Sequence, residues 1–219
     1  MLEIVEKFIT ISGEAPTIGE PIFLIRLSGC NLTCSYCDTT YNNEVNEYIS
    51  SDNLKNEIIE NVQDFPELKV LFTGGEPLLK ERQEDIFAII NDLKYINFYI
   101  ETNGSVPITN FTLPNCYFVA DWKSPTSKNE IDFYLDNLKH FRIDKDCIKF
   151  VVSKDDLHWL KTKISHINKI NPFLPLYVSP QFNKITLEEI ADFIIKNKLP
   201  LKMSFQFHKI IWPLKDRGV

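Results

Sequence analysis

The sequence predicts an α/β protein built as an open, partial (β/α)6-type barrel. Short apolar runs typical of strands alternate with amphipathic segments typical of helices, which predicts a parallel sheet with right-handed crossovers. About six such units fit into the chain, too few for a closed eight-fold barrel. Polar, turn-forming motifs follow the strands, and parallel β/α folds bind ligands at that edge of the sheet.

The expected strands are the runs rich in β-branched and aromatic residues. They span residues 21–28, 69–73, 97–101, 117–122, 147–152 and 175–178, and a seventh is expected at 202–207. The first of these leads directly into a cluster of cysteines.

The expected helices lie between the strands and show apolar residues at helical spacing. They span residues 52–62, 82–93, 130–140, 155–167 and 186–196. Ser51 or Asp52 is expected to cap the first helix, and Thr186 with Glu189 has the spacing of a capping box for the last.

Four further motifs should meet the cysteine cluster at the carboxyl edge of the sheet. Each follows a predicted strand, so the topology brings them together. They are Thr73-Gly74-Gly75-Glu76-Pro77, Glu101-Thr102-Asn103-Gly104, Asp121-Trp122-Lys123 and Ser179-Pro180-Gln181.

Length and composition are those of an ordinary globular domain. With 219 residues and no repeat, low-complexity tract or linker, we expect one domain over 1–219. The net charge of −6 argues against a nucleic-acid partner. Because no apolar run reaches about 18 residues and the first ten residues are not those of a signal peptide, we expect no membrane contact and a cytoplasmic location.

Three of the five cysteines form the spacing Cys30-x3-Cys34-x2-Cys37. Three ligands are one fewer than a structural zinc or a fully protein-ligated iron–sulfur cluster uses. The loop therefore predicts a [4Fe–4S] cluster with one open iron. A zinc loop completed by Cys116, Cys147 or a histidine is the alternative, although a separate buried cysteine is usually inert.

The cysteine spacing, with Tyr36 before the last cysteine and Gly74-Gly75-Glu76-Pro77 after the second strand, resembles the radical S-adenosylmethionine (SAM) superfamily. The resemblance implies a partial barrel of the radical SAM kind with a [4Fe–4S] cluster and SAM as cofactors. Cys30, Cys34 and Cys37 would hold the cluster. We expect the two glycines to let backbone approach the ligand closely, and Glu76 to add negative charge beside it.

A narrower resemblance is to the 7-carboxy-7-deazaguanine synthases. It rests on Phe8–Glu14, on the segment from Phe23 through Cys37-Asp38-Thr39, on Thr73–Leu79, and on the tail with Gln206-Phe207-His208-Lys209, Trp212 and Arg217-Gly218-Val219. It implies conversion of 6-carboxy-5,6,7,8-tetrahydropterin to 7-carboxy-7-deazaguanine with loss of ammonia. It also implies a Mg²⁺ ion, a flavodoxin or ferredoxin as electron donor, and a homodimer.

The resemblance assigns roles to individual positions. Thr39 would be a ligand of Mg²⁺. Arg26 would bind the substrate carboxylate as a fork, and Glu14 would accept N–H donors of the amino-pyrimidine edge. The remaining substrate-binding residues would be Ile11, Ser12, Gly13, Thr73, His208 and Pro213. SAM would be held by Tyr36, Asp38, Gly75, Glu76, Asp121, Trp122, Lys123, Ser179, Pro180, Gln181 and Phe182.

Two segments depart from the pattern of the synthases. Their usual Gln-Gly-Glu-Gly is Ser12-Gly13-Glu14-Ala15 here, which removes an amide from the substrate segment. Their usual Ser-Pro-Lys is Asp121-Trp122-Lys123. Two other functions share parts of the sequence pattern: a glycyl-radical-activating enzyme that acts on a partner protein, and a non-enzymatic zinc-binding module.

Overall fold

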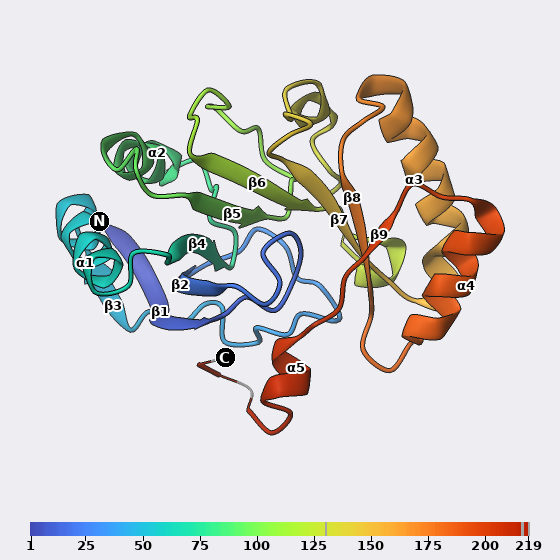
Figure 1. The fold of residues 1–219 in the computed structure, drawn as a ribbon, viewed down its shortest axis with the longest axis horizontal. Coiled ribbons are helices and arrows are strands. Elements are labelled where there is room, and N and C mark those ends of the chain that lie inside the picture. Colours follow the sequence, from blue (N-terminus) through green and yellow to red (C-terminus); the bar gives the residue numbers. More distant parts are fainter. Residues whose placement is uncertain (130, 216, 219) are drawn as a thin grey trace.

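The computed structural model describes residues 1–129, 131–215 and 217–218. Its strands form one sheet in the order β3-β1-β2-β4-β5-β6-β7-β8-β9 (Figure 1). Neighbouring strands pair in parallel from β2 to β9, whereas β1 pairs antiparallel with β2 and with β3. The sheet curves without closing, which confirms the open partial barrel. The strands are β1 (Leu2–Ile11), β2 (Pro21–Leu27), β3 (Glu47–Ile49), β4 (Lys69–Gly74), β5 (Phe98–Thr102), β6 (Cys116–Asp121), β7 (Cys147–Val152), β8 (Leu176–Pro180) and β9 (Lys202–Met203).

The six predicted core strands are present within two residues at each end. The expected seventh strand is only two residues long in β9, because the chain then leaves the sheet toward the cysteine loop. The strands β1 and β3 were not expected. Strand β1 mixes charged and apolar residues, and it lies between β3 and β2 near the edge of the sheet, where part of the strand is exposed.

The helices are α1 (Ser51–Asp64), α2 (Gln83–Asp92), α3 (Leu157–Ile170), α4 (Leu187–Asn197) and α5 (His208–Ile211), with short 3-10 turns η1 (Pro125–Ser127), η2 (Leu135–Lys139) and η3 (Lys154–Asp156). The cap of α1 is Ser50, one residue before the predicted position, and the capping box of Thr186 and Glu189 is confirmed. The helix predicted over 130–140 is wrong. Residue 130 lies outside the described part, and the rest forms only η2, because Asn137 bonds to the backbone of Val106 and Ile108 instead.

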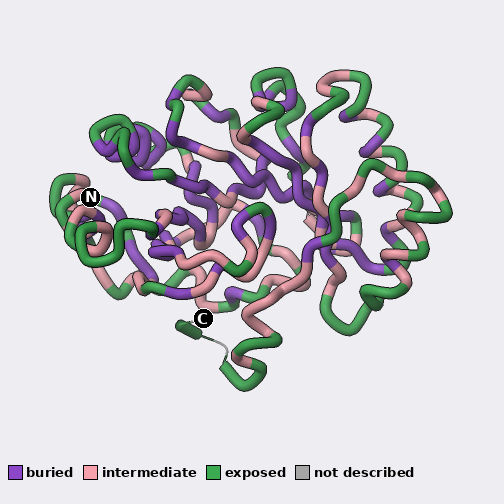
Figure 2. The backbone as a smooth tube through the Cα atoms, viewed as in Figure 1, coloured by how far each residue is buried: buried purple, intermediate pink, exposed green. Residues whose placement is uncertain are grey.

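The sheet separates two sets of side chains. On the convex side, where α1 to α4 lie, the main core includes Phe72, Phe98, Phe118 and Phe150. On the concave side a smaller cluster includes Leu24, Leu71 and Val119. Figure 2 shows that burial is concentrated along the strands, while the outer helix faces are exposed. Polar residues on the concave side therefore need partners or ligands.

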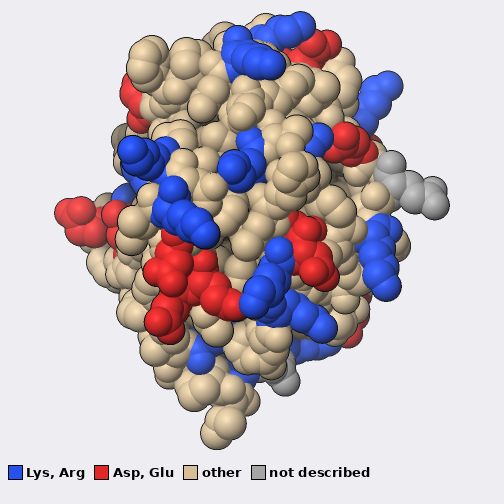
Figure 3. Space-filling model, turned by 90° about the vertical axis from the view of Figure 1, so that its right-hand side faces the viewer, with Lys and Arg blue, Asp and Glu red and all other residues tan. Residues whose placement is uncertain are grey.

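Charge on the surface is mixed. Figure 3, which turns the right-hand side of Figure 1 toward the viewer, shows acidic and basic side chains interspersed on that face. Within the described ranges, no helix has the length and hydropathy needed to cross a membrane.

Candidate active site

The three predicted cluster ligands lie in one loop after β2, and all three are free and partly exposed. Each sulfur is within reach of an asparagine side-chain amide that comes from a different segment. Asn129 Nδ2 donates to Cys34 Sγ at 2.9 Å, and the amides of Asn103 and Asn42 lie 3.9 and 3.8 Å from Cys30 Sγ and Cys37 Sγ. Amide donors around cysteine sulfurs are the surroundings that tune iron–sulfur clusters.

The chemistry of these cysteines fits a cluster. Burial raises the pKa of the thiols of Cys30 and Cys34, so iron must displace protons to bind them. In the part of the chain that the structure covers, no three His, Cys, Asp or Glu side chains already stand together as metal ligands. Cys116 and Cys147 are buried in strands of the sheet, so neither lies in the loop as a fourth zinc ligand.

The glycines of the Gly-Gly-Glu-Pro motif pack against the backbone that leads from β2 into the cysteine loop. A Cβ atom at Gly75 would lie 1.9 Å from the carbonyl oxygen of Gly29, and one at Gly74 would lie 2.3 Å from that of Leu27. Gly75 N donates to Leu27 O at 2.9 Å, and Glu76 N donates to Gly29 O at 2.8 Å. The structure shows a close approach of these glycines to the protein's own backbone just before Cys30, and their approach to a ligand stays a prediction.

The carboxylate of Glu76 is fully buried and bonded within the protein. It accepts from Leu78 N at 2.8 Å, from Thr102 Oγ1 at 2.7 Å and from Asn103 N at 2.7 Å. Glu76 thus joins the end of β4 to the loop that follows β5. The carboxylate thereby orients Asn103, whose amide faces Cys30, and its place beside SAM stays a prediction.

Arg82 is a further support that the sequence analysis did not identify. Its guanidinium is buried and donates to Ser28 O at 2.7 Å and to Gly29 O at 3.4 Å. These carbonyls belong to the two residues before Cys30, so Arg82 holds the entrance of the cysteine loop.

A group of charged side chains lies on the concave face near the carboxyl edge. Lys149 of β7 is bonded to the carboxylate of Glu14, and its Nζ is 3.7 Å from Asp121 Oδ2. Asp121 also pairs with Lys123 at 2.8 Å. Glu101 of β5 accepts from Thr73 Oγ1 at 3.2 Å. Burial raises the pKa of Glu101, and Lys149 opposes that shift.

Arg26 of β2 lies beside this group and is fixed by protein contacts. Its Nε donates to Glu6 Oε1 at 2.6 Å, and its Nη1 donates to Thr39 Oγ1 at 3.2 Å. Thr39 is buried and donates to Asp38 Oδ1 at 3.3 Å. Although desolvation raises the pKa of Asp38, nearby cations, led by Arg26, outweigh it and lower that pKa. Hydroxyl and carboxylate oxygens side by side fit the hard ligands that Mg²⁺ prefers.

The Asp121-Trp122-Lys123 motif points in two directions. Asp121 and Lys123 pair on the rim, whereas the side chain of Trp122 is 1% exposed and stacks on Phe133 in the convex core at 4.5 Å between ring centroids. Alternation along β6 explains this, since consecutive side chains face opposite sides of the sheet. The side chain of Trp122 does not reach the rim, so a contact of Trp122 with SAM would use its backbone and stays a prediction.

Two polar atoms on this rim fit a bound cofactor. Asp121 Oδ1 and Ser179 Oγ are buried and have no hydrogen-bond partner among the residues that the structure places. Both belong to segments that the sequence assigns to SAM. Buried polar atoms are normally satisfied, so these two mark where a polar ligand is expected.

Tyr36 joins the cysteine loop to the loop after β6. Its hydroxyl lies 3.4 Å from Ser124 Oγ, and the Nζ of Lys123 lies 6.0 Å from the centroid of its ring. Burial raises the pKa of Tyr36 to about 12, so the hydroxyl stays protonated and the ring remains uncharged at neutral pH. An adenine contact of this ring stays a prediction.

The predicted N-terminal and C-terminal substrate segments meet. Phe207 N donates to Gly13 O at 2.8 Å, and a Cβ at Gly13 would lie 2.4 Å from His208 Nδ1. Glycine therefore lets the imidazole pack on this backbone. The hydroxyl of Ser12 bonds to Thr17 Oγ1 at 2.8 Å and so is turned into its own loop. Ile11 is partly buried, and Pro213 is exposed on the tail.

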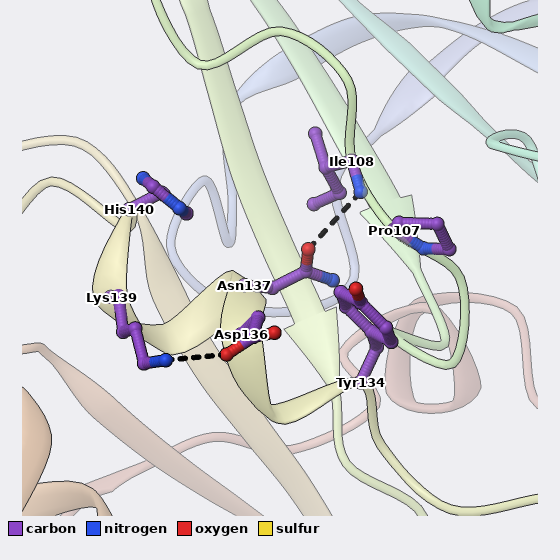
Figure 4. Close-up of a pocket in the computed structure, with 7 residues that line it drawn as sticks. All are labelled: Pro107, Ile108, Tyr134, Asp136, Asn137, Lys139 and His140. Atoms are coloured by element: carbon purple, nitrogen blue, oxygen red, sulfur yellow. Dashed lines mark hydrogen bonds and ion pairs between the residues drawn. The ribbon is translucent and has the colours of Figure 1, made fainter.

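The segment after β8 borders a cavity of about 560 Å³ against the tail. Pro180 and Phe182 line it, and Lys209 Nζ lies 4.8 Å from the centroid of the Phe182 ring. Gln181 accepts from Thr126 Oγ1 at 3.3 Å. A second cavity, of about 390 Å³, contains no predicted site residue; it is lined by Pro107, Ile108, Tyr134, Asp136, Asn137, Lys139 and His140 (Figure 4).

Six residues of the site were not among the predicted site residues: Glu101, Lys149, Asn42, Asn103, Asn129 and Arg82. Glu101 and Asn103 lie in a motif that the strand-end rule had already placed at this edge. Lys149 stands alone as a charge in an apolar strand, which was a usable signal. The other three lie in loops or at a helix start with no local signature.

Comparison with known proteins agrees with this arrangement. Residues 24–110 match the Radical SAM superfamily. The 7-carboxy-7-deazaguanine synthase of Clostridium acetobutylicum is 38% identical, covering 99% of each chain, and that of Thermoplasma acidophilum is 33% identical, covering 95% of this chain and 96% of the relative. A solved structure of QueE from Escherichia coli has the same fold, with a TM-score of 0.69 at 21% identity over 93% of both chains. The identity over the full length, together with the cysteine loop and the fold, places this chain in the 7-carboxy-7-deazaguanine synthase family of radical SAM enzymes.

Proposed function

We propose that this enzyme converts 6-carboxy-5,6,7,8-tetrahydropterin to 7-carboxy-7-deazaguanine with loss of ammonia. The observation that carries the proposal is the position of the cysteine loop beside a charged concave face that includes Arg26, Glu14 and Lys149. When bound, the cluster and SAM supply a radical that abstracts a hydrogen atom from the substrate. The protein positions the pterin and excludes water.

Arg26 suits the substrate carboxylate. Glu6 and Thr39 engage only part of its N–H donors, and they hold the guanidinium in one orientation. A guanidinium held in place loses less entropy when it binds a carboxylate. Thr73, whose hydroxyl points to Glu101, lies on the next strand in register with Arg26 and would contact the ring.

His208 suits a contact with the pterin from the side of the C-terminal tail. Burial lowers its pKa, whereas the negative charges of Glu14 and Asp38 oppose that shift. Because the imidazole packs on the backbone of Gly13, in the predicted substrate segment, it would cover the bound pterin. Ile11, Ser12 and Pro213 stay predicted contacts.

Three further features belong to the proposal. Mg²⁺ would bind at Thr39, supported by the neighbouring carboxylate of Asp38. The electron donor would be a flavodoxin or a ferredoxin, and the enzyme would be a cytoplasmic homodimer of single-domain chains spanning 1–219. Light scattering should give twice the mass of one chain; the mass of one chain would reject the dimer.

The test uses protein purified without oxygen and reconstituted with iron and sulfide. SAM, dithionite, Mg²⁺ and the pterin are added, and mass spectrometry follows 5′-deoxyadenosine and 7-carboxy-7-deazaguanine. Formation of both products is expected. Deoxyadenosine without the deazaguanine would reject the substrate and favour an activating enzyme for a partner protein, and the absence of a cluster would favour the zinc-binding module.

A further inference from the structure

Lys149 is a buried charge in an otherwise apolar strand. It lies in the middle of β7, its side chain is 8% exposed, and its neighbours in register are Asp121 of β6 and Tyr177 of β8. A buried ammonium group is costly unless it is paired. Lys149 therefore depends on the carboxylates around it.

Those carboxylates come from three separate parts of the chain. Glu14, in the loop after β1, is bonded to the ammonium group, and Asp121 Oδ2 lies 3.7 Å from it. Glu101 of β5 interacts with it electrostatically. Although burial lowers the pKa of Lys149, these three acids outweigh the effect and raise it well above its usual value. The surrounding carboxylates therefore favour the charged form of Lys149.

The other cations around this cluster have partners other than Glu14. Lys123 pairs with Asp121, while Arg26 is bonded to Glu6 and Thr39 and keeps further N–H donors for the substrate. The negative charges of Glu14 and Asp38 act on the pKa of His208, but no hydrogen bond joins the described side chain of His208 to either carboxylate. Of these cations, Lys149 is the one that bonds Glu14 directly. Without its charge, the carboxylates of Glu14, Asp121 and Glu101 would face each other across the concave side and repel.

We propose that Lys149 is a positioning residue for substrate recognition, because its ammonium group holds the carboxylate of Glu14 in the orientation that accepts the N–H donors of an amino-pyrimidine ring. The inference rests on the proposed function and adds a residue to it. A carboxylate accepts paired N–H groups only when its oxygens face them, and the bond to Lys149 sets that orientation. Lys149 thus contributes to specificity without touching the substrate.

The test measures binding of 6-carboxy-5,6,7,8-tetrahydropterin by anaerobic calorimetry. The reconstituted holoenzyme carries SAM and receives no reductant, so that no turnover occurs. Lys149→Met should weaken binding at least tenfold at pH 7, whereas Lys149→Arg should stay within a few-fold of the wild type. Lys161→Met, at an exposed position of α3, is the matched control and should bind normally.

One further readout separates positioning from a merely structural role. The double variant Lys149→Met/Glu14→Gln should bind no more weakly than Glu14→Gln alone, since the lysine acts through that carboxylate.

The outcomes are distinguishable. If the wild type does not bind the pterin, the proposed function fails. If the wild type binds and Lys149→Met binds equally well, or if the losses of the two single variants multiply in the double variant, the inference about Lys149 is overturned. Circular dichroism and iron content check folding; should Lys149→Met not fold, Lys149→Gln gives the same comparison with a polar side chain.

Discussion

At the scale of the residue, surroundings decide what each carboxylate does. Glu76 is enclosed by three donors of the protein and orients a loop. Glu14 pairs with the buried Lys149 on the concave side, and Glu44 pairs with Arg217 of the tail at the surface. The same chemical group thus orients a loop, pairs with a buried lysine and anchors the tail. Residue type alone predicted only that carboxylates gather at this edge.

A substitution at Gly75 tests whether the Gly-Gly-Glu-Pro motif supports the cysteine loop. Gly75→Ala places a methyl group against the carbonyl of Gly29, so we expect a loss of about 1–3 kcal/mol in the free energy of unfolding and reduced iron uptake. Urea denaturation and iron analysis measure the two effects. Gly19→Ala is the control: its positive φ of 83° costs about 1 kcal/mol, but no atom lies within 4 Å, so iron uptake should be normal. Normal iron content in Gly75→Ala would contradict the explanation.

Thr39 tests the proposed Mg²⁺ site. In Thr39→Ala the hydroxyl ligand is lost, and the Mg²⁺ concentration for half-maximal activity should rise roughly tenfold or more while the iron content stays unchanged. Thr39→Ser keeps the hydroxyl and should respond almost as the wild type does. An unaltered Mg²⁺ response in Thr39→Ala would remove this residue from the metal site.

At the scale of the element, the cysteine loop is held by other loops. The turn into α2 supplies Arg82, and the loops after β5 and β6 supply Asn103 and Asn129. The tail completes the enclosure, because Gln206 donates to Asp38 at 3.2 Å. Arg217 forms two bonds to Glu44, at 2.9 and 2.7 Å. Its guanidinium also lies 3.8 Å from the centroid of the Tyr41 ring.

The ion pair between Arg217 and Glu44 predicts that the attachment of the C-terminal tail depends on pH. The hydrogen bonds from Arg217 lower the pKa of Glu44 below its usual 4.5. A lowered pKa means that the stabilisation is complete above the usual value and is lost as the pH falls through the lowered one. Glu44→Gln should therefore speed tryptic cleavage of the tail at pH 7 by roughly a few-fold, as suits an exposed pair.

In acid, the wild-type tail should become as accessible to a protease as the tail of Glu44→Gln, because protonated Glu44 no longer pairs with Arg217. Below the usual pKa of Glu44, pepsin, which is active in acid, should cleave the wild type and Glu44→Gln at rates that converge. Glu57→Gln, which alters a carboxylate of α1 that pairs with Lys7, serves as the control. Equal tryptic rates for the wild type and Glu44→Gln at pH 7 would show that the pair does not hold the tail.

At the scale of the whole molecule, the curved sheet separates the apolar side chains that stabilise the fold from the charged side chains of the candidate site. The convex side carries the large aromatic core under the helices, and the concave side carries the charged groups. Adjacent residues of one motif therefore serve different purposes. Trp122 belongs to the core, and its neighbour Asp121 belongs to the rim.

This division predicts opposite effects of two neighbouring substitutions. Trp122→Phe removes packing and the bond from Nε1 to Asp132, so it should cost about 1–3 kcal/mol of unfolding free energy and leave SAM affinity unchanged. Asp121→Asn should weaken SAM binding with little change in stability. Denaturation and equilibrium dialysis with SAM measure the pair. Weaker SAM binding in Trp122→Phe together with normal binding in Asp121→Asn would reverse the assignment.

The sequence by itself determined the alternation of strands and helices, the cysteine loop and the edge of the sheet where the motifs gather. These features depend on short-range patterns: spacing within eight residues, periodicity within an element, and the rule that parallel strands share a carboxyl edge. Only the tertiary structure decided that the Gly-Gly-Glu-Pro motif supports the loop, that Trp122 faces the core, and that residues 131–140 form no α-helix. It also decided that Asn129 faces Cys34 and that Lys149 meets Glu14. The last two contacts join residues 95 and 135 positions apart, and their geometry depends on strand register and sheet curvature, which no local pattern specifies.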